Sequence, residues 1–418
     1  MKRSPLVVIF ITVFIDLIGF GIVIPVLPFY VEGTKFNATP RAVGLLFASY
    51  SIMQLIFTPI LGRLSDKYGR RPVLLISLLG TSLGFLILGF ATTLWMLFAG
   101  RILDGITGGN ISTAQAYIAD VTTAENRAKG MGMIGAAFGL GFIFGPAIGG
   151  ILSRWGMSVP FLFAAALAFA NATLLYFALP ESITPDHPAH QQAGENRWRQ
   201  LFKAFSQPRL KFVLTLYFLF ILAFSIMTTT FALYTMYRFG FDAQHNGYLF
   251  AFIGIIAVFI QGLLIGRLVK RFGELFLVVS GALILMIGLL MIPYVGPQAG
   301  GLFALLFVCG IFSIGNSLST PALTSLASKS VGASERGGVL GITQSAASLA
   351  RVVGPVIGAF LIYSASAPRH MDDHSIFKTF WAAAGIMFAA FLLALYFARA
   401  HAAEYAKTNF QEQMADAG

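Results

Sequence analysis

Charged residues are scarce in this chain. Only 11% of its 418 residues are Asp, Glu, Lys or Arg, whereas 57% are hydrophobic, and the mean hydropathy is +0.79. Soluble domains carry about 25% charged residues, so this composition excludes a globular protein with a water-covered surface. The chain needs lipid as its solvent, and a bilayer is its first expected partner.

Cysteine and histidine are also rare. The single cysteine, Cys309, lies in an apolar segment, and the six histidines fall in expected loops or the C-terminal tail, without the helical spacing of metal ligands. We therefore expect no disulfide and no metal site. Gly130–Gly135 matches the dinucleotide pattern GxGxxG, but no strand precedes it, and the chain has no Walker A sequence. The sequence predicts no cofactor and no ATP-driven pump.

Apolar stretches of about 20 residues recur along the chain, each long enough to cross a hydrocarbon core of about 30 Å as a helix. We predict an all-α membrane protein with twelve spanning helices, at residues 6–30, 40–62, 72–91, 95–118, 129–151, 159–179, 210–237, 246–268, 275–294, 300–327, 338–363 and 376–399. The first stretch is longer than a signal-peptide core and lacks a small-residue cleavage site, so we expect it to be retained.

The 28 Lys and Arg residues are distributed unevenly between the two ends of these helices. Twenty lie on the side of the N-terminus, six lie on the opposite side, and Arg101 and Arg351 lie within spans. Since cytoplasmic loops are rich in Lys and Arg, both termini are predicted to be cytoplasmic, in an inner (cytoplasmic) cell membrane. The net charge of +11 thus reflects topology, and we expect no nucleic-acid partner.

The chain divides into two similar halves. Residues 180–209, with four prolines and mixed charge, are typical of a linker. The predicted parts are an N-terminal six-helix bundle (1–179), a cytoplasmic linker (180–209), a C-terminal six-helix bundle (210–400) and a cytoplasmic tail (401–418). Gly62–Gly69 aligns with Gly266–Gly273, and Arg127–Gly149 with Arg336–Gly358. Parallel repeats of this kind are typical of transporters whose two bundles move around a central site.

Three motifs stand out in the first half, two with charged residues and one rich in small residues. Gly62–Pro72 reads GRLSDKYGRRP, in which glycines permit a tight reversal and Asp66 can accept charge-assisted hydrogen bonds. Arg101 and Asp104 are three residues apart on one helical face, where they can pair. Gly135–Gly150 is rich in small residues, which let helices approach closely in lipid.

With these motifs, nearly the whole chain resembles the major facilitator superfamily, and within it the twelve-helix drug:proton antiporters that include the tetracycline/proton antiporters. The resemblance implies two pseudo-symmetric six-helix bundles that work by alternating access. The residues that match the conformational latch are Gly62, Asp66, Gly69, Arg70, Asp120 and Arg127, and those that match the antiporter motif are Gly135, Gly139, Gly145, Pro146 and Gly149. We expect Arg70 to pair with Asp120 and the latch to hold the outward-facing state.

Only two acids, Asp16 and Asp104, lie well inside the predicted helices. A carboxyl group in a low-dielectric cavity favours its protonated form, as a proton carrier requires. In the family that this chain resembles, the acid of the first helix faces the cavity. We predict proton coupling at Asp16, Asp104 and Arg101, with Asp16 as the first choice. The alternative is a structural ion pair between Asp16 and Arg101.

Polar and aromatic residues at helical positions compatible with a central cavity form the predicted substrate site. They are Tyr50, Gln54, Asn110, Gln115, Phe231, Tyr234, Gln261, Asn316, Gln344 and Arg351. Each could equally hold helices together by hydrogen bonds. Arg351 has no acid within the second-half spans, and could attract an anionic group or form a salt bridge across the cavity.

The sequence departs from the tetracycline branch, which has acids in the third and ninth helices. This chain reads Thr81–Gly84 and Gly281–Ile284 there, without an acid. Tetracycline travels as a metal-chelated cation, so another amphipathic drug or metabolite is equally compatible. We predict a monomer that exports such a small molecule in exchange for protons. The alternatives are a facilitator or proton symporter for a sugar or other nutrient, and a receptor or scaffold. An enzyme is not expected.

Overall fold

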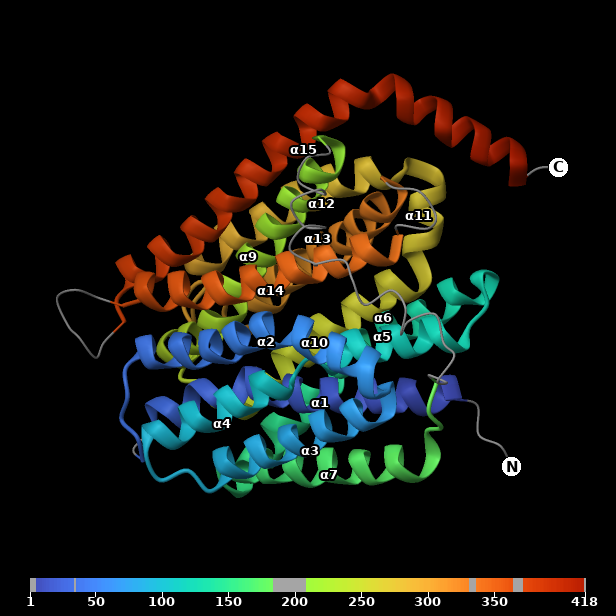
Figure 1. Ribbon diagram of the computed structural model, residues 1–418. Helices are drawn as coiled ribbons and strands as arrows, with labels where there is room; N and C mark the ends of the chain where they lie inside the picture. Colours follow the sequence, from blue (N-terminus) through green and yellow to red (C-terminus); the bar gives the residue numbers. More distant parts are fainter. Residues whose placement is uncertain (1–4, 34, 183–207, 331–335, 364–370, 417–418) are drawn as a thin grey trace.

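The structure is a computed structural model that describes residues 5–33, 35–182, 208–330, 336–363 and 371–416, without the side chains of 124–129, 208–209, 336–338, 340 and 401–416. The described chain is almost entirely helical (Figure 1). Eleven of the described helical segments are long and apolar enough to cross a membrane. The predicted all-α membrane fold is confirmed.

Two groups of helices follow one another along the chain. The first contains α1 (Pro5–Glu32), α2 (Pro40–Tyr68), α3 (Arg70–Gly89), α4 (Leu94–Thr107), α5 (Asn110–Val121), α6 (Ala124–Leu152), the short η1 (Ser153–Trp155) and α7 (Val159–Ala178). The second contains α9 (Pro208–Phe239), α10 (Ala243–Phe259), the π-helical turn η3 (Ile260–Leu264), α11 (Ile265–Phe272), α12 (Glu274–Met291), η4 (Ile292–Tyr294), α13 (Gly301–Lys329), α14 (Arg336–Leu361) and α15 (Asp373–Asp416).

The predicted fourth span, 95–118, is interrupted. It consists of α4 and α5, separated by a turn at Gly108 and Gly109. Glycine is a weak helix former, and the Gln54 side chain donates a hydrogen bond of 3.0 Å to the Gly108 carbonyl. This bond satisfies a backbone group where the helix is broken, which a membrane interior requires.

The last helix is longer than predicted. α15 extends from Asp373 to Asp416 and therefore includes most of the segment 401–418 that was expected to be a tail. Of the linker predicted at 180–209, residues 183–207 lie outside the described residues. Its first residues pack against the first group, since Tyr117 donates a hydrogen bond of 3.0 Å to the Pro180 carbonyl.

The buried core is divided between the two groups of helices. One cluster consists of residues from α9 to α15 with Ile24 of α1, and two others lie within α1 to α7. The groups meet where α6 packs on α10 and α2 on α14. Figure 1 shows α2 and α10 between the blue-to-green helices of the first group and the orange-to-red helices of the second. The space between the groups contains the candidate site.

Candidate functional site

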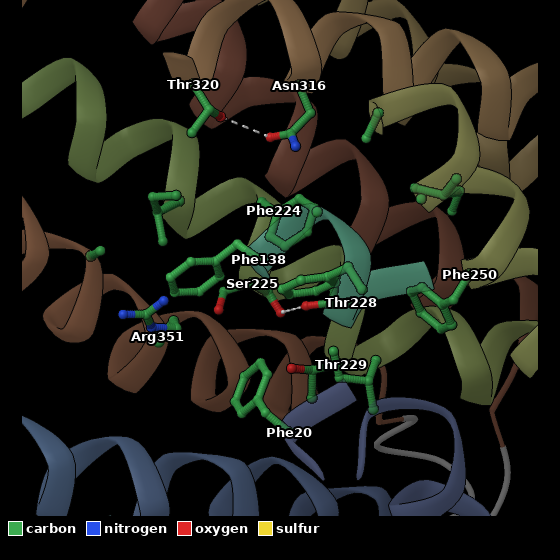
Figure 2. Close-up of a pocket in the computed structure, with 18 of the residues that line it drawn as sticks. Phe20, Phe138, Phe224, Ser225, Thr228, Thr229, Phe250, Asn316, Thr320 and Arg351 are labelled. Carbon is green, nitrogen blue, oxygen red and sulfur yellow. Dashed lines mark hydrogen bonds between the residues drawn. The ribbon is translucent and has the colours of Figure 1, made fainter. Parts of the chain in front are cut away.

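A cavity of about 510 Å³ lies between the two groups of helices. Its walls come from α1, α2, α4 and α6 on one side and from α9, α10, η3, α13 and α14 on the other. Figure 2 shows Phe20, Phe138, Phe224 and Arg351 around this space. A volume in this range accommodates a drug-sized molecule.

Aromatic rings form much of the wall. Phe20 lies 6.0 Å from the ring of Tyr50 and 6.1 Å from that of Phe142, between ring centroids. Phe142 is 6.4 Å from Phe224, which stacks on Phe312 at 5.8 Å. This row crosses from the first group of helices to the second, so a ligand in the cavity would contact aromatic faces from both groups.

The cavity is closed at the end of the bundle where α1 finishes and α2 begins. There α6 and α10 touch backbone to backbone: a Cβ atom added at Gly150 would lie 3.0 Å from the Gly247 Cα. One at Gly254 would lie 2.7 Å from Ile143, and one at Gly139 would lie 3.1 Å from Val258. In these pairs the residue numbers fall along α6 as they rise along α10, so the two helices run antiparallel. Their contact closes the cavity from its middle to this end.

The two helices separate towards the other end. The same register would place Gly135 opposite Gly262, but a Cβ atom added at either meets nothing within 4 Å. The separation coincides with the π-helical turn η3, which contains Gly262. Such turns are frequent at functional sites. The cavity therefore opens towards the end where α1 begins and α2 finishes.

Polar contacts reinforce the closed end. The Arg41 guanidinium of α2 lies 3.9 Å from the ring centroid of Tyr363, just after α14, and 5.0 Å from that of Phe360. Arg154 of η1 donates a hydrogen bond to Gln244 of α10. Both contacts join the first group of helices to the second.

A buried ion pair lies beside the cavity. Arg101 is fully buried and donates a 3.0 Å hydrogen bond to Asp104, which is 5% exposed. The guanidinium also lies 4.2 Å from the centroid of the Tyr50 ring. The Tyr50 hydroxyl accepts a hydrogen bond of 3.0 Å from Gln54. Two donor nitrogens of Arg101 have no hydrogen-bond partner among the described residues.

Asp16 lies close to this pair without joining it. Its carboxyl group approaches the side chain of Asn110 and is within electrostatic range of Asp104. Arg101 pairs with Asp104, and no ion pair joins it to Asp16 among the described residues. Asp16 does not line the cavity, whereas Phe20, one helical turn later, does. The structure thus brings both predicted acids together at the cavity edge.

Five of the ten residues predicted for the substrate cavity line it: Tyr50, Gln261, Asn316, Gln344 and Arg351. The other five do not. Gln54 and Asn110 lie behind the wall, near Tyr50 and Asp16 respectively, and Gln115 is a half-buried residue of α5. Phe231 and Tyr234 are fully buried in the core of the second group. The Tyr234 hydroxyl donates to the carbonyls of Ile292 and Val295, which orients this side chain into that core.

The predicted latch residues form a network at the open end. Arg70 donates hydrogen bonds to Asp120, at 3.0 Å, and to Ser65, at 2.7 Å, and it also bonds to Asp66. The expected pair between Arg70 and Asp120 is therefore present.

The other predicted latch residues lie nearby in sequence or outside the described side chains. Gly62 lies buried on α2, and Gly69, with φ +101°, separates α2 from α3. The Arg127 side chain lies outside the described residues.

Glu181 completes this network and was not predicted from the sequence. Its carboxylate accepts backbone hydrogen bonds of 2.9 Å from Arg70 and 3.0 Å from Arg71, the first residues of α3. An acid at a helix N-terminus is favourable because it meets unpaired N–H groups and the positive end of the helix dipole. Glu181 is distant in sequence from α3, so no local pattern points to this contact.

The glycines of the antiporter motif lie on two faces of α6, one that packs against α1 and one that packs against α10. A Cβ atom added at Gly145 would lie 2.7 Å from Gly21 of α1, and one at Gly149 would lie 3.0 Å from the Ile22 carbonyl. Pro146 packs against α1 as well as α10. Gly139 faces α10, and Gly135 lines the open part of the cavity. The motif therefore allows α6 to approach α1 and α10 at the same time.

Comparison with known proteins identifies the family. The Major Facilitator Superfamily profile matches residues 9–355 and 299–415. The class H tetracycline resistance protein of Pasteurella multocida is 36% identical over 407 residues, which cover 95% of this chain and 96% of that protein. Multidrug resistance protein 2 of Bacillus subtilis is 31% identical over 367 residues, covering 86% of this chain and 89% of that protein.

A solved structure has the same architecture. The crystal structure of the human organic anion transporter MFSD10 (TETRAN) aligns with a TM-score of 0.71 and 25% identity, covering 94% of this chain and 99% of that chain. The resemblance to the tetracycline-resistance branch is thus confirmed, and a transporter fold excludes the enzyme class. By its matched profile, its relatives and its helical architecture, the chain belongs to the Major Facilitator Superfamily of membrane transporters.

Proposed function

We propose that the protein exports a small amphipathic drug or metabolite, such as a tetracycline-like compound, across the inner membrane in exchange for protons. The observation that carries the proposal is the aromatic cavity between two groups of helices, with Asp16 and Asp104 at its edge. Relatives named for tetracycline and multidrug resistance support export of a drug. An aromatic wall favours an amphipathic organic molecule over a sugar, which requires more polar partners.

The proposed cycle is alternating access by a monomer. The distribution of Lys and Arg favours cytoplasmic termini, so the open end of the cavity would face the cytoplasm and the closed end the outside. Release to the outside requires α6 and α10 to separate at Gly150 and Gly247 and to meet at Gly135 and Gly262. Protonation of Asp16 or Asp104 would change the charge beside Arg101 and so bias the two states.

Transport into proteoliposomes under an imposed pH gradient tests this function. Drug flux should follow the gradient in the wild type and lose that dependence in Asp16→Asn. The matched control is Asp373→Asn, since Asp373 is an exposed acid paired with Arg238 at 2.8 Å, at the closed end. Flux that ignores both the gradient and Asp16→Asn would refute proton exchange.

We also propose that the network around Arg70 is a latch that stabilises the outward-facing state. In the present conformation it joins α2, α3 and α5 with Glu181, all in the first group of helices. The proposal requires the network to gain contacts with the second group in the outward-facing state, so Asp66→Asn and Asp120→Asn should change transport rates and the populations of the two states. Unchanged rates and populations in both variants would exclude the latch.

A further inference from the structure

Arg351 of α14 is a cation in the cavity wall that lacks an ionic partner. Among the described residues its guanidinium makes one hydrogen bond, of 3.5 Å, to the Ser348 hydroxyl on its own helix. Its Nε atom is buried without a hydrogen-bond partner among the described residues. No acid lies within salt-bridge distance of it in the described part of the chain. Figure 2 shows this side chain in the wall near Phe138 and Ser225.

The charges of the cavity wall are unbalanced. Among the described residues, the lining contains two arginines, Arg101 and Arg351, and no aspartate or glutamate. Arg101 is compensated by Asp104, just behind the wall. Arg351 is therefore the uncompensated charge of the described lining. An unpaired charge at membrane depth is costly and usually marks a functional site.

The groups around Arg351 do not neutralise it. Tyr217 and Tyr50 are the titratable side chains within electrostatic range, and both are phenols, which are uncharged near neutral pH. Apart from the two arginines, the described lining is uncharged, with apolar side chains such as Phe138 and with hydroxyl and amide groups such as Ser225 and Gln344. A guanidinium presents a planar set of N–H donors that matches the two oxygens of a carboxylate or sulfonate.

We propose that Arg351 is the subsite for one anionic group on the substrate, a carboxylate or sulfonate, whose apolar body lies along the row Tyr50, Phe20, Phe142, Phe224 and Phe312. The substrate class is then an amphipathic aromatic anion, which differs from the metal-chelated cation that the tetracycline branch transports. This inference rests on the proposed transport function, whose cavity it uses. A small inorganic anion would pair with the charge but leave the aromatic wall without a partner.

Binding of a matched pair of fluorescent ligands to the full chain in nanodiscs tests the proposal. Dansylglycine and dansylglycinamide share one aromatic body, but only the first carries a carboxylate. We expect the wild type to bind the acid about tenfold more tightly than the amide, which corresponds to about 1.4 kcal/mol. Equal affinities for the two ligands would overturn the proposal, and this comparison needs no variant.

Variants show whether Arg351 is responsible for the preference for the acid. Arg351→Gln should abolish it, and Arg351→Lys should retain part of it, because lysine keeps the charge but lacks the planar fork. Arg267→Gln is the matched control, since Arg267 is exposed on α11 and, in the described part of the chain, bonds to the Leu263 carbonyl of its own helical segment. If Arg351→Gln weakens acid and amide equally, Arg351 is a structural cation and the proposal is wrong.

The outcome is separable from that of the proposed function. Charge-selective binding with no drug flux in any pH gradient would leave the anion subsite standing and refute export. Gradient-driven drug flux with no preference between acid and amide would support export and refute the anion subsite.

Discussion

The Glu181 carboxylate occupies the space beside Gly69 that a side chain would fill. A Cβ atom added at Gly69 would lie 2.6 Å from Glu181 Oε2, and Gly69 has φ +101°. Both the backbone conformation and the cap on α3 therefore require glycine at this position.

Gly69→Ala should destabilise the protein by about 1–3 kcal/mol, the usual cost of forcing a side chain into such a conformation. Chemical denaturation in detergent measures this. Gly132→Ala is the control, since Gly132 is within α6 with nothing within 4 Å of its added Cβ atom. Equal denaturation midpoints for the two variants would contradict the role of Gly69.

Asp120 and Asp66 both bond to Arg70, but they differ in exposure. The Asp120 side chain is 9% exposed and the Asp66 side chain 37%. Asp120→Asn should lower the free energy of unfolding by about 1.5–3 kcal/mol, as expected for a hydrogen bond to a charged group. Asp66→Asn should cost clearly less because solvent screens that pair. A larger loss of stability for Asp66→Asn than for Asp120→Asn would contradict this explanation by burial and solvent screening.

The ring of Tyr50 stabilises the buried Arg101. Tyr50→Phe keeps the ring against the guanidinium and loses the hydrogen bond that the hydroxyl accepts from Gln54. Tyr50→Leu also loses the cation–π contact, and should be less stable than Tyr50→Phe by about 0.5–2 kcal/mol. Thermal unfolding of the two variants provides the comparison, and indistinguishable melting temperatures would show that the ring contributes nothing.

Closure of the cavity depends on small residues at the closed end. Gly150→Val would insert a branched side chain where an added Cβ atom already lies 3.0 Å from the Ala243 carbonyl. We expect this variant to separate α6 from α10 at that end and to shift the population towards the opposite state.

Spin labels at Trp155 and His245, both exposed near this contact, measure the separation by double electron–electron resonance. Cys309 is fully buried and should not be labelled. Gly150→Val should lengthen the distance between the labels. The control, Gly132→Val, should not, because the space around Gly132 is open. Unchanged distances in Gly150→Val would argue against this closure.

Tyr234 has a structural role in the second group of helices. Its hydroxyl donates to the carbonyls of Ile292, at 2.9 Å, and Val295, at 2.6 Å. Tyr234→Phe leaves these buried carbonyls without this donor, and should cost about 1–3 kcal/mol of stability. Ligand affinity of the folded variant should match the wild type. A selective loss of affinity at unchanged stability would place Tyr234 in the substrate site instead.

Much of the fold could be predicted because hydrophobicity along the chain depends on local sequence. A stretch of about 20 apolar residues can cross a bilayer only as a helix. The spans follow from this rule, except where Gly108 and Gly109 divide one of them. Pairs such as Arg101 with Asp104 follow from helical spacing, since residues three apart share a face.

The candidate site was predicted only in part. Tyr50 and Arg351 line the cavity, but Tyr234, an equally plausible candidate, lies in the core. Membrane helices such as α1 and α9 are apolar on nearly every side, so their sequences do not indicate which side faces the cavity. That orientation depends on packing against neighbouring helices.

The sequence by itself determined the membrane class, the helical spans and the presence of rare buried charges, because each depends on composition or local spacing. The tertiary structure decided which charges are compensated. Asp16 of α1 stays outside the Arg101–Asp104 pair, Glu181 caps α3 from a distant part of the chain, and Arg351 faces the cavity with no acid within salt-bridge distance among the described residues. These outcomes depend on distances between helices, which the order of residues does not contain.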